Sequence, residues 1–423
     1  GALWAGIDVV FTLPSGESAG YGPWGFIDGA RREKPEYWHV KKVYSPVRIA
    51  EEPLAVPAAG EPVVVRVANR HDFTNLGELR VDWQLIDRGA IVEWGALNGI
   101  DVAPRSEGAI SVQPKTETID GKTLGLVFTS PQGFVVDSFM LPIGAPKEAP
   151  IPAMDTPGSL EDTADAFVLS GSGVRWHIDK ATGQVVRVES GGVAMTLGGP
   201  ALMMPPLKSD ACEPKYRAGI APLNAMCANA RVESVTADGA AVVVRVCYDE
   251  AEGEYRLAAD SAGRLRLGYR FVVSREFQPR QVGVVLDLPR ACDTLEWQRK
   301  AQWSVYPLDH IGRARGKARA FPEANGPWAL DTTALGSADF RSSKDEILSA
   351  SLSGTDGAGL RLVSDGHQTA RAFVDGEHVR WLVAGYSNAG RGFQTGLDGR
   401  EITLKPGDVV EDEVVLEILN VEF

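Results

Sequence analysis

The chain has 423 residues, enough for two to three domains, and its formal charge of −13 gives it no diffuse positive field to attract nucleic acid. Its 44% hydrophobic and 23% charged residues are globular values, and no apolar run approaches the roughly 20 residues that span a bilayer. We therefore expect neither a nucleic acid nor a membrane as partner. The 46 glycines and 26 prolines favour many strands and turns.

Residues 1–49 have the pattern of one strand, one long loop and one helix. The apolar run at residues 2–7 predicts a strand buried on both faces, and Pro35 suits a first helical position. Apolar side chains follow at helical spacing, namely Tyr37, Val40, Tyr44 and Val47. A single unit of this kind cannot bury its own strand, so the sequence predicts that it belongs to a larger sheet.

Residues 50–144 change to a period of two. Leu79, Val81, Trp83 and Leu85 alternate with polar residues, as in a strand with one wet face. Further strand candidates lie at residues 63–67, 91–94, 124–128 and 134–141. This pattern predicts an immunoglobulin-like β-sandwich, with Trp83 in its core.

A Pro-rich linker is predicted at residues 145–160, and strands dominate again from residue 161 to residue 423. Strand candidates in this segment are residues 167–169, 174–178, 242–246 and 265–271. More than 250 residues of such pattern predict a large two-sheet sandwich.

Neither the cysteines nor the glycine-rich run indicates a metal or cofactor site. Cys212, Cys227, Cys247 and Cys292 form no Cys-x-x-Cys pair, so we expect thiols, with a Cys212–Cys227 disulfide as the alternative. Residues 20–25 (GYGPWG) match a dinucleotide-binding pattern but open no helix, and Pro23 removes an amide. They predict a loop with tight turns beside an aromatic platform.

Several motifs carry a family resemblance. Residues 4–8 (WAGID), 20–29 (GYGPWGFIDG) and 31–46 (RREKPEYWHVKKVYSP) resemble the last strand, loop and helix of the catalytic barrel in glycoside hydrolase family 2, the family of β-galactosidases. Residues 67–69, residues 73–75 and Trp83 resemble that family's immunoglobulin-like domain. Landmarks of its last domain, the β-galactosidase small-chain type, are matched by residues 171–173, 179–183, 199–200, 295–297 and 339–344.

The resemblance implies a mainly β chain in three parts: the terminal strand-helix unit of a (β/α)8 TIM barrel (1–49), an immunoglobulin-like sandwich (50–144) and a large supersandwich domain (161–423). It implies a retaining β-galactosidase whose partners are a carbohydrate substrate and a missing N-terminal part, with a homo-oligomer possible. No certain cofactor follows, although members of the family can use Mg or Na ions. A periplasmic or extracellular location is slightly favoured over a cytoplasmic one.

A retaining glycosidase needs two carboxyl groups about 5–5.5 Å apart. The resemblance implies two glutamates, one after an Asn and both before the last barrel strand, and no Asn-Glu pair occurs in this chain. We therefore predict no catalytic residue here and an inactive isolated chain. The acids of the first segment, Asp8, Glu17, Asp28 and Glu33, are not expected to replace the pair.

Three residues are predicted to bind substrate. The resemblance implies that the Trp4 ring stacks on the sugar, the alternative being a core residue that closes the barrel. Trp24 is predicted as a second sugar platform or a simple loop anchor. His367 lies in a loop that the family sends toward the active site, where its best-known members carry a Trp.

An aromatic and polar cluster in the last domain suits either carbohydrate or the edge of a sandwich core. Its members are Trp297, Trp303, Tyr306, Asp309, His310 and Arg313. A competing hypothesis for the whole chain is a non-catalytic carbohydrate-binding or scaffold module, because fold does not fix function.

Overall fold

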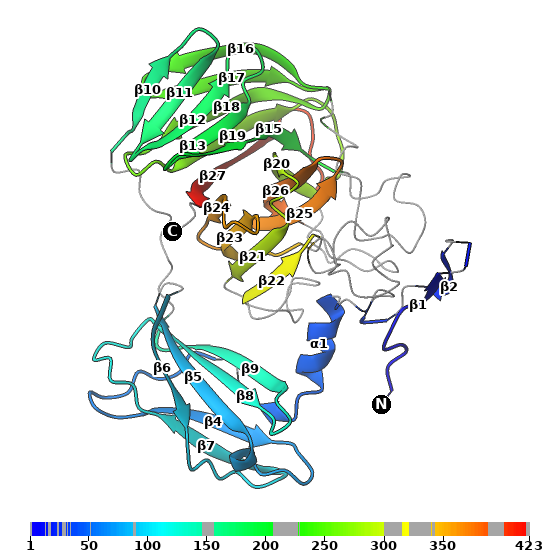
Figure 1. Ribbon diagram of the computed structural model, residues 1–423, viewed down its shortest axis with the longest axis vertical. Coiled ribbons are helices and arrows are strands. Elements are labelled where there is room, and N and C mark those ends of the chain that lie inside the picture. The colour runs from blue at the N-terminus through cyan, green and yellow to red at the C-terminus, as the bar shows by residue number, and fades with distance from the viewer. Residues whose placement is uncertain are drawn as a thin grey trace. The chain divides into compact units, whose positions relative to one another are not determined.

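A computed structural model describes most of the chain, in two compact units that we treat separately: Trp38–Ala149, and Gly1–Tyr37 together with Pro150–Phe423 (Figure 1). The described residues are 2–12, 14–15, 18–22, 25–27, 31, 33, 35–50, 52–87, 90–145, 156–205, 227, 229–299, 315–320, 340, 343–387 and 402–419. Strands dominate these residues, which confirms a mainly β chain. Within them, no helix is both long enough and apolar enough to cross a membrane.

The smaller unit is an antiparallel two-sheet sandwich. One sheet has the order β3 (Val47–Arg48), β4 (Val63–Asn69), β7 (Ser106–Val112). The other has the order β6 (Ala90–Leu97), β5 (Arg80–Asp87), β8 (Thr123–Thr129), β9 (Val135–Pro142), and a 3-10 turn (Leu76–Glu78) precedes β5. Val81, Trp83 and Leu85 of β5 are buried between the sheets, which confirms the predicted period-two strand and the core position of Trp83.

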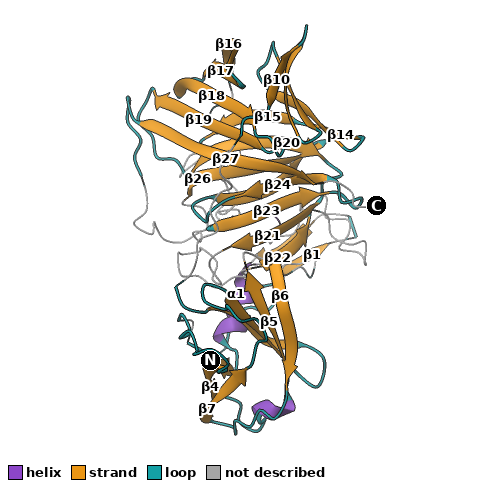
Figure 2. Cartoon of the chain, turned by 90° about the vertical axis from the view of Figure 1, so that its left-hand side faces the viewer, coloured by secondary structure: helices purple, strands orange, loops and turns teal. Residues whose placement is uncertain are grey.

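Among its described residues, the larger unit contains three large antiparallel sheets besides a two-stranded one in residues 9–22. A five-stranded sheet runs β10 (Ser159–Asp162), β11 (Ala166–Gly171), β12 (Val174–Asp179), β13 (Val185–Ser190), β14 (Val193–Thr196). A four-stranded sheet runs β15 (Gly198–Met203), β20 (Gln281–Pro289), β26 (His378–Ser387), β25 (Thr369–Asp375). A nine-stranded sheet runs β16 (Arg231–Asp238), β17 (Ala241–Cys247), β18 (Ala251–Ala259), β19 (Leu265–Val273), β27 (Val409–Leu419), β24 (Gly359–Val363), β23 (Ile347–Ser353), β21 (Thr294–Arg299), β22 (Arg315–Arg319) (Figure 2).

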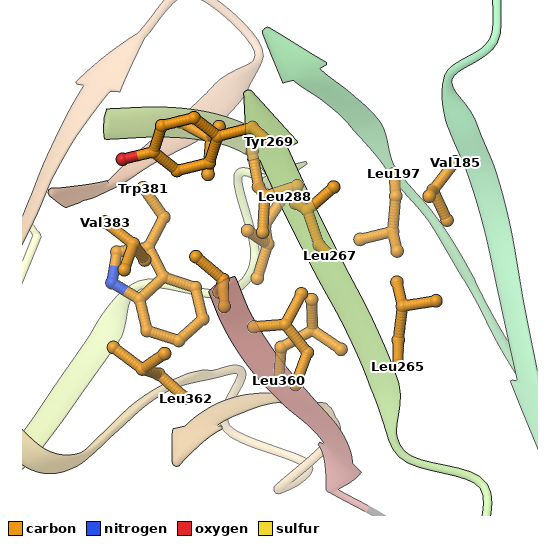
Figure 3. Close-up of a cluster of buried hydrophobic side chains, with 14 of the residues drawn as sticks. Val185, Leu197, Leu265, Leu267, Tyr269, Leu288, Leu360, Leu362, Trp381 and Val383 are labelled. Carbon is orange, nitrogen blue, oxygen red and sulfur yellow. The ribbon is translucent and has the colours of Figure 1, made fainter. Parts of the chain in front are cut away.

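One hydrophobic core joins these three sheets. Figure 3 shows Leu265, Leu267 and Tyr269 of β19 in one cluster with Trp381 and Val383 of β26 and with buried side chains from β13 and β24. The alternation along β19 is regular, every second side chain being buried. The predicted strand pattern of this segment is therefore confirmed. Because the space between the sheets is filled by apolar side chains, polar side chains are expected at the sheet edges and in the connecting turns.

The first segment differs from the prediction in two places. Residues 2–7 form no strand apart from a single parallel bridge between Ile7 and Ile27; the strand β1 (Val9–Thr12) starts later and pairs with β2 (Ser18–Gly22), which had been predicted as a loop. A strand buried on both faces needs neighbours on both sides, and among the described residues 2–7 has only that bridge.

Helix α1 (Pro35–Val43) begins at the predicted proline but ends earlier than the apolar spacing indicated. Ser45 precedes Pro46, and a residue before proline is disfavoured in the helical conformation. Val47 consequently lies in β3, where it pairs with Asn69 of β4, so only Tyr37 and Val40 of the predicted face are helical.

Candidate functional site

Of the three residues predicted to bind substrate, His367 is the one that lies among charged side chains in the described part of the chain. It is located in the turn that leads from β24 into β25. Gly366 has a φ of 101°, a conformation that favours glycine, and the Asp365 carboxylate accepts the backbone N–H of His367 at 3.0 Å. The turn is thus formed by the local sequence Asp-Gly-His. It directs the imidazole toward β27 of the neighbouring sheet.

The His367 ring lies between two carboxylates. Its Nδ1 contacts Asp365 Oδ1, its Nε2 is 2.9 Å from Asp412 Oδ1 in β27, and the side chain is 41% exposed. Partial burial lowers the pKa of His367, but the hydrogen bonds and negative charges of Asp365 and Asp412 raise it by more, so the net shift is upward. The raised pKa favours the charged imidazolium form of His367, and the ring remains accessible to solvent.

Asp412 is held by several groups. Gln368 donates from Nε2 to Asp412 Oδ2 at 2.9 Å and to the Glu413 carbonyl at 2.9 Å. Tyr269 of β19 lies opposite Asp412; burial, followed by the Asp412 charge, raises the pKa of the Tyr269 phenol. A Cβ at Gly385 would lie 2.8 Å from Asp412 Oδ2, so the glycine makes room for this carboxylate.

The same segment continues as a buried polar row at the start of β25. Thr369 donates to Asp345 Oδ1 at 2.6 Å, and Arg371 Nη1 is 3.4 Å from Gln281 Oε1 of β20. Gln281 in turn donates to Ser387 at 3.1 Å. Because Thr369, Arg371, Asp345 and Gln281 are almost fully buried, they fix the strand end that carries His367. The arrangement holds the partly exposed, positively charged imidazole ring in a fixed position, with both of its nitrogens bonded to carboxylates.

The other predicted site residues are not brought together with His367. Trp4 lies ahead of β1 and is 80% exposed, so its ring is accessible in this chain. Trp24 lies outside the described residues. Within the aromatic cluster Trp297 is a buried core residue of β21, and the remaining members, residues 303, 306, 309, 310 and 313, lie outside the described part.

The acidic residues of the first segment that the structure describes differ in burial. Asp8 is buried and accepts the Gly25 backbone N–H at 2.7 Å, Glu33 is exposed, and Glu17 and Asp28 lie outside the described residues.

Cys227 is a free buried thiol, so the alternative of a Cys212–Cys227 disulfide is wrong; Cys212 itself lies outside the described residues. Cys247 and Cys292 are also free, and burial together with nearby acids raises the pKa of Cys292 to about 11. No group of three or more His, Cys, Asp or Glu in the described part is arranged to hold a metal.

Sequence reasoning missed the partners of His367. Asp412 is 45 residues away, and Gln281 is 90 residues from Arg371, so only strand pairing reveals these contacts. One signal was available. The run Asp-Gly-His-Gln-Thr at residues 365–369 is unusually polar for the entry to a strand whose remainder is apolar, and buried polar side chains need partners.

Part of the smaller unit is similar to a known protein domain. Residues 65–130, which run from β4 to the end of β8, match the family model for β-galactosidase domain 4. Curated protein sequences yield no match to the chain.

Solved structures with some likeness include three carbohydrate-related proteins. The first is a galactose mutarotase related enzyme from Lactobacillus acidophilus (9% identity, 60% of this chain and 98% of that one, TM-score 0.34). Others are the alpha-N-acetylgalactosaminidase NagBb from Bifidobacterium bifidum, a quadruple mutant (12%, 60% and 36%, 0.30), and an alpha-mannosidase from Enterococcus faecalis V583 (10%, 85% and 42%, 0.36). The chain thus spans less than half the length of these two glycosidases, and such TM-scores are too low to establish a shared fold.

Proposed function

We propose that this chain is the C-terminal portion of a retaining glycosidase of the β-galactosidase type in glycoside hydrolase family 2, which cleaves β-linked galactosides or related glycosides. The observation that carries the proposal is the match of residues 65–130 to β-galactosidase domain 4. It is supported by the barrel-like motifs that precede this segment and by the large sandwich unit that follows it.

The described residues are proposed to shape the substrate site and to leave the bond cleavage to another part of the enzyme. Retention requires a nucleophile and an acid/base, both carboxylates, and the chain has no Asn-Glu pair to supply the latter. Asp8 is a poor substitute because its carboxylate is buried and already accepts the Gly25 amide. The isolated chain is therefore expected to be inactive.

Trp4, Trp24 and His367 are proposed to contact the carbohydrate. An exposed indole such as that of Trp4 can stack on the C–H face of a sugar ring. The two ring nitrogens of His367 are both engaged by Asp365 and Asp412, so the partly exposed ring would meet a sugar through its face and its positive charge. The role proposed for His367 is a contact of its exposed ring face with the leaving-group side of the substrate.

The test compares the purified chain with the full-length product of its gene on a chromogenic β-galactoside. We expect turnover with retention of configuration, followed by NMR of the first-formed sugar, only for the full-length protein. Hydrolysis by the chain alone that is lost in Asp8→Asn or Glu17→Gln would overturn the assignment of catalysis to residues outside it. A full-length protein that binds saccharides but cleaves none of a panel of β-glycosides would favour the binding-module hypothesis.

A further inference from the structure

Residues 98–102 follow β6 and pack against the 3-10 turn of the smaller unit. From Ile100 onward this segment is firmly held. The Ile100 carbonyl lies so close to Gly77 that a Cβ there would collide with it, and Asn75 donates from Nδ2 to Asp101 Oδ1 at 2.8 Å. The path of the chain beyond residue 99 is therefore fixed by its contacts with the turn.

The two residues before Ile100 have no such contacts. Asn98 and Gly99 are both exposed, and among the described residues neither the Asn98 side chain nor the Gly99 N–H has a hydrogen-bond partner. Gly99 has a φ of 72°, a conformation that favours glycine, and a Cβ built on it would meet no atom within 4 Å. The side-chain amide of Asn98 and the backbone nitrogen of Gly99 are therefore free to approach each other.

The sequence Asn-Gly is also the one in which an asparagine is chemically least stable. The backbone nitrogen of the next residue attacks the asparagine side chain, and glycine hinders this attack least because it carries no side chain. The other described asparagines, Asn69, Asn75 and Asn229, precede arginine, leucine and alanine, and each donates from Nδ2 to an oxygen atom. Among the described asparagines, Asn98 alone combines a following glycine with an unbonded side chain.

We propose that Asn98 is a site of spontaneous deamidation, with water as the co-reactant. The Gly99 nitrogen loses its proton and bonds to Asn98 Cγ, the Cγ–Nδ2 bond breaks, and ammonia leaves with that proton, which closes a succinimide ring. Water then adds to one of the ring carbonyls. Opening of the ring at Cγ leaves an aspartate, whereas opening at the backbone carbonyl leaves an isoaspartate, whose link to Gly99 runs through Cγ.

The isoaspartate is expected to loosen the 3-10 turn, because it adds one atom to the main chain directly before the segment that is held there. The Leu76 N–H donates to the Val102 carbonyl at 3.1 Å, and the Gly77 N–H donates to Asn75 Oδ1 at 2.8 Å. These amides should therefore exchange their hydrogens faster in the aged chain. An aspartate at position 98 leaves the main chain unchanged and should not have this effect.

The test incubates the folded 423-residue chain at mildly alkaline pH, which favours loss of the amide proton, and follows it by tryptic peptide mapping with mass spectrometry. The peptide of residues 89–105 contains Asn98 and no other asparagine. We expect it to gain about 1 Da and to become a substrate for isoaspartyl methyltransferase. Asn98→Gln should lose this gain, and Gly99→Ala should slow it severalfold. Asn325, which also precedes a glycine, lies outside the described residues and in a different tryptic peptide.

Asn229 is the matched control within the same chain. It is also exposed, but it precedes Ala230 and donates from Nδ2 to Asp249 at 2.7 Å, so its tryptic peptide should keep its mass. Asn98→Asp should exchange hydrogens in the turn like the fresh parent chain, which separates the effect of the added charge from that of the altered main chain. A peptide of residues 89–105 that keeps its mass in the folded chain, a gain that persists in Asn98→Gln, or an equal gain in the Asn229 peptide would each overturn the proposal.

Discussion

Replacing Trp83 by alanine should destabilise the smaller unit strongly. Trp83 is 7% exposed and lies in the core between the two sheets, where its indole is so close to β6 that a Cβ at Gly95 would lie 2.8 Å from Nε1. A tryptophan buries roughly 150–250 Å², which at about 25 cal/mol per Å² is worth roughly 4–6 kcal/mol. Measured losses for such truncations are about 3–5 kcal/mol, and we expect a value in that range.

Trp4 should behave in the opposite way. Because its side chain is 80% exposed, Trp4→Ala removes only about 50 Å² of buried area and should cost at most about 1 kcal/mol of stability. In the proposed full-length enzyme, however, we propose that this ring stacks on the sugar, where it would contribute to transition-state binding. We expect kcat/KM to fall about 30- to 1,000-fold, which corresponds to roughly 2–4 kcal/mol.

Stability is best followed by hydrogen exchange of peptides from β5 and β8, because these peptides report on the smaller unit by itself. Steady-state kinetics of the full-length variants supply the second measurement, with the folded fraction of Trp83→Ala used to normalise its rate. The reasoning fails if Trp4→Ala leaves kcat/KM within about threefold of the parent. It also fails if Trp83→Ala leaves exchange in β5 and β8 unchanged.

Three further predictions concern stability. Trp176→Phe should cost roughly 2–4 kcal/mol in urea unfolding, since it removes ring volume from the core and the 2.9 Å hydrogen bond to the Gly263 carbonyl. Because folding raises the pKa of His367, its charged form stabilises the folded chain fully at pH values below about 6.5, the pKa of an unperturbed histidine, and this stabilisation is lost as the pH rises through the raised pKa. In His367→Gln the melting temperature, measured by calorimetry, should therefore depend less on pH over that range. Lys42→Met should cost about 3–5 kcal/mol by leaving buried Asp137 without its 3.1 Å ion pair, and adding Asp137→Asn should recover part of the loss in the same unfolding assay.

The strands were predictable from the sequence because their burial pattern is local. In β19 each residue's environment follows from its parity along the strand, so Leu265, Leu267 and Tyr269 identify the buried face before any partner strand is known. The same reasoning worked for β5. It needs no knowledge of the sheet order.

The errors arose where neighbours decide the structure. The apolar composition of residues 2–7 indicated a buried strand. A strand forms only where its backbone pairs with a neighbouring strand, and the pairing of β1 with β2 begins at Val9. At the end of α1, apolar spacing continued through Val47 while Pro46 had already broken the helix. A backbone restriction of this kind outweighs side-chain periodicity, because an extra helical turn would require Ser45 in a disfavoured conformation.

The candidate site adds a further reason why sequence alone was insufficient. β27, the last described strand in the chain, lies between β19 and β24 in the interior of the nine-stranded sheet, where it completes pairing on both sides. Asp412 belongs to this strand, so the carboxylate that holds His367 is positioned only when that sheet is complete. The His367 site is therefore coupled to the formation of the core of the larger unit, since the strand that supplies Asp412 also supplies buried Val414 and Leu416.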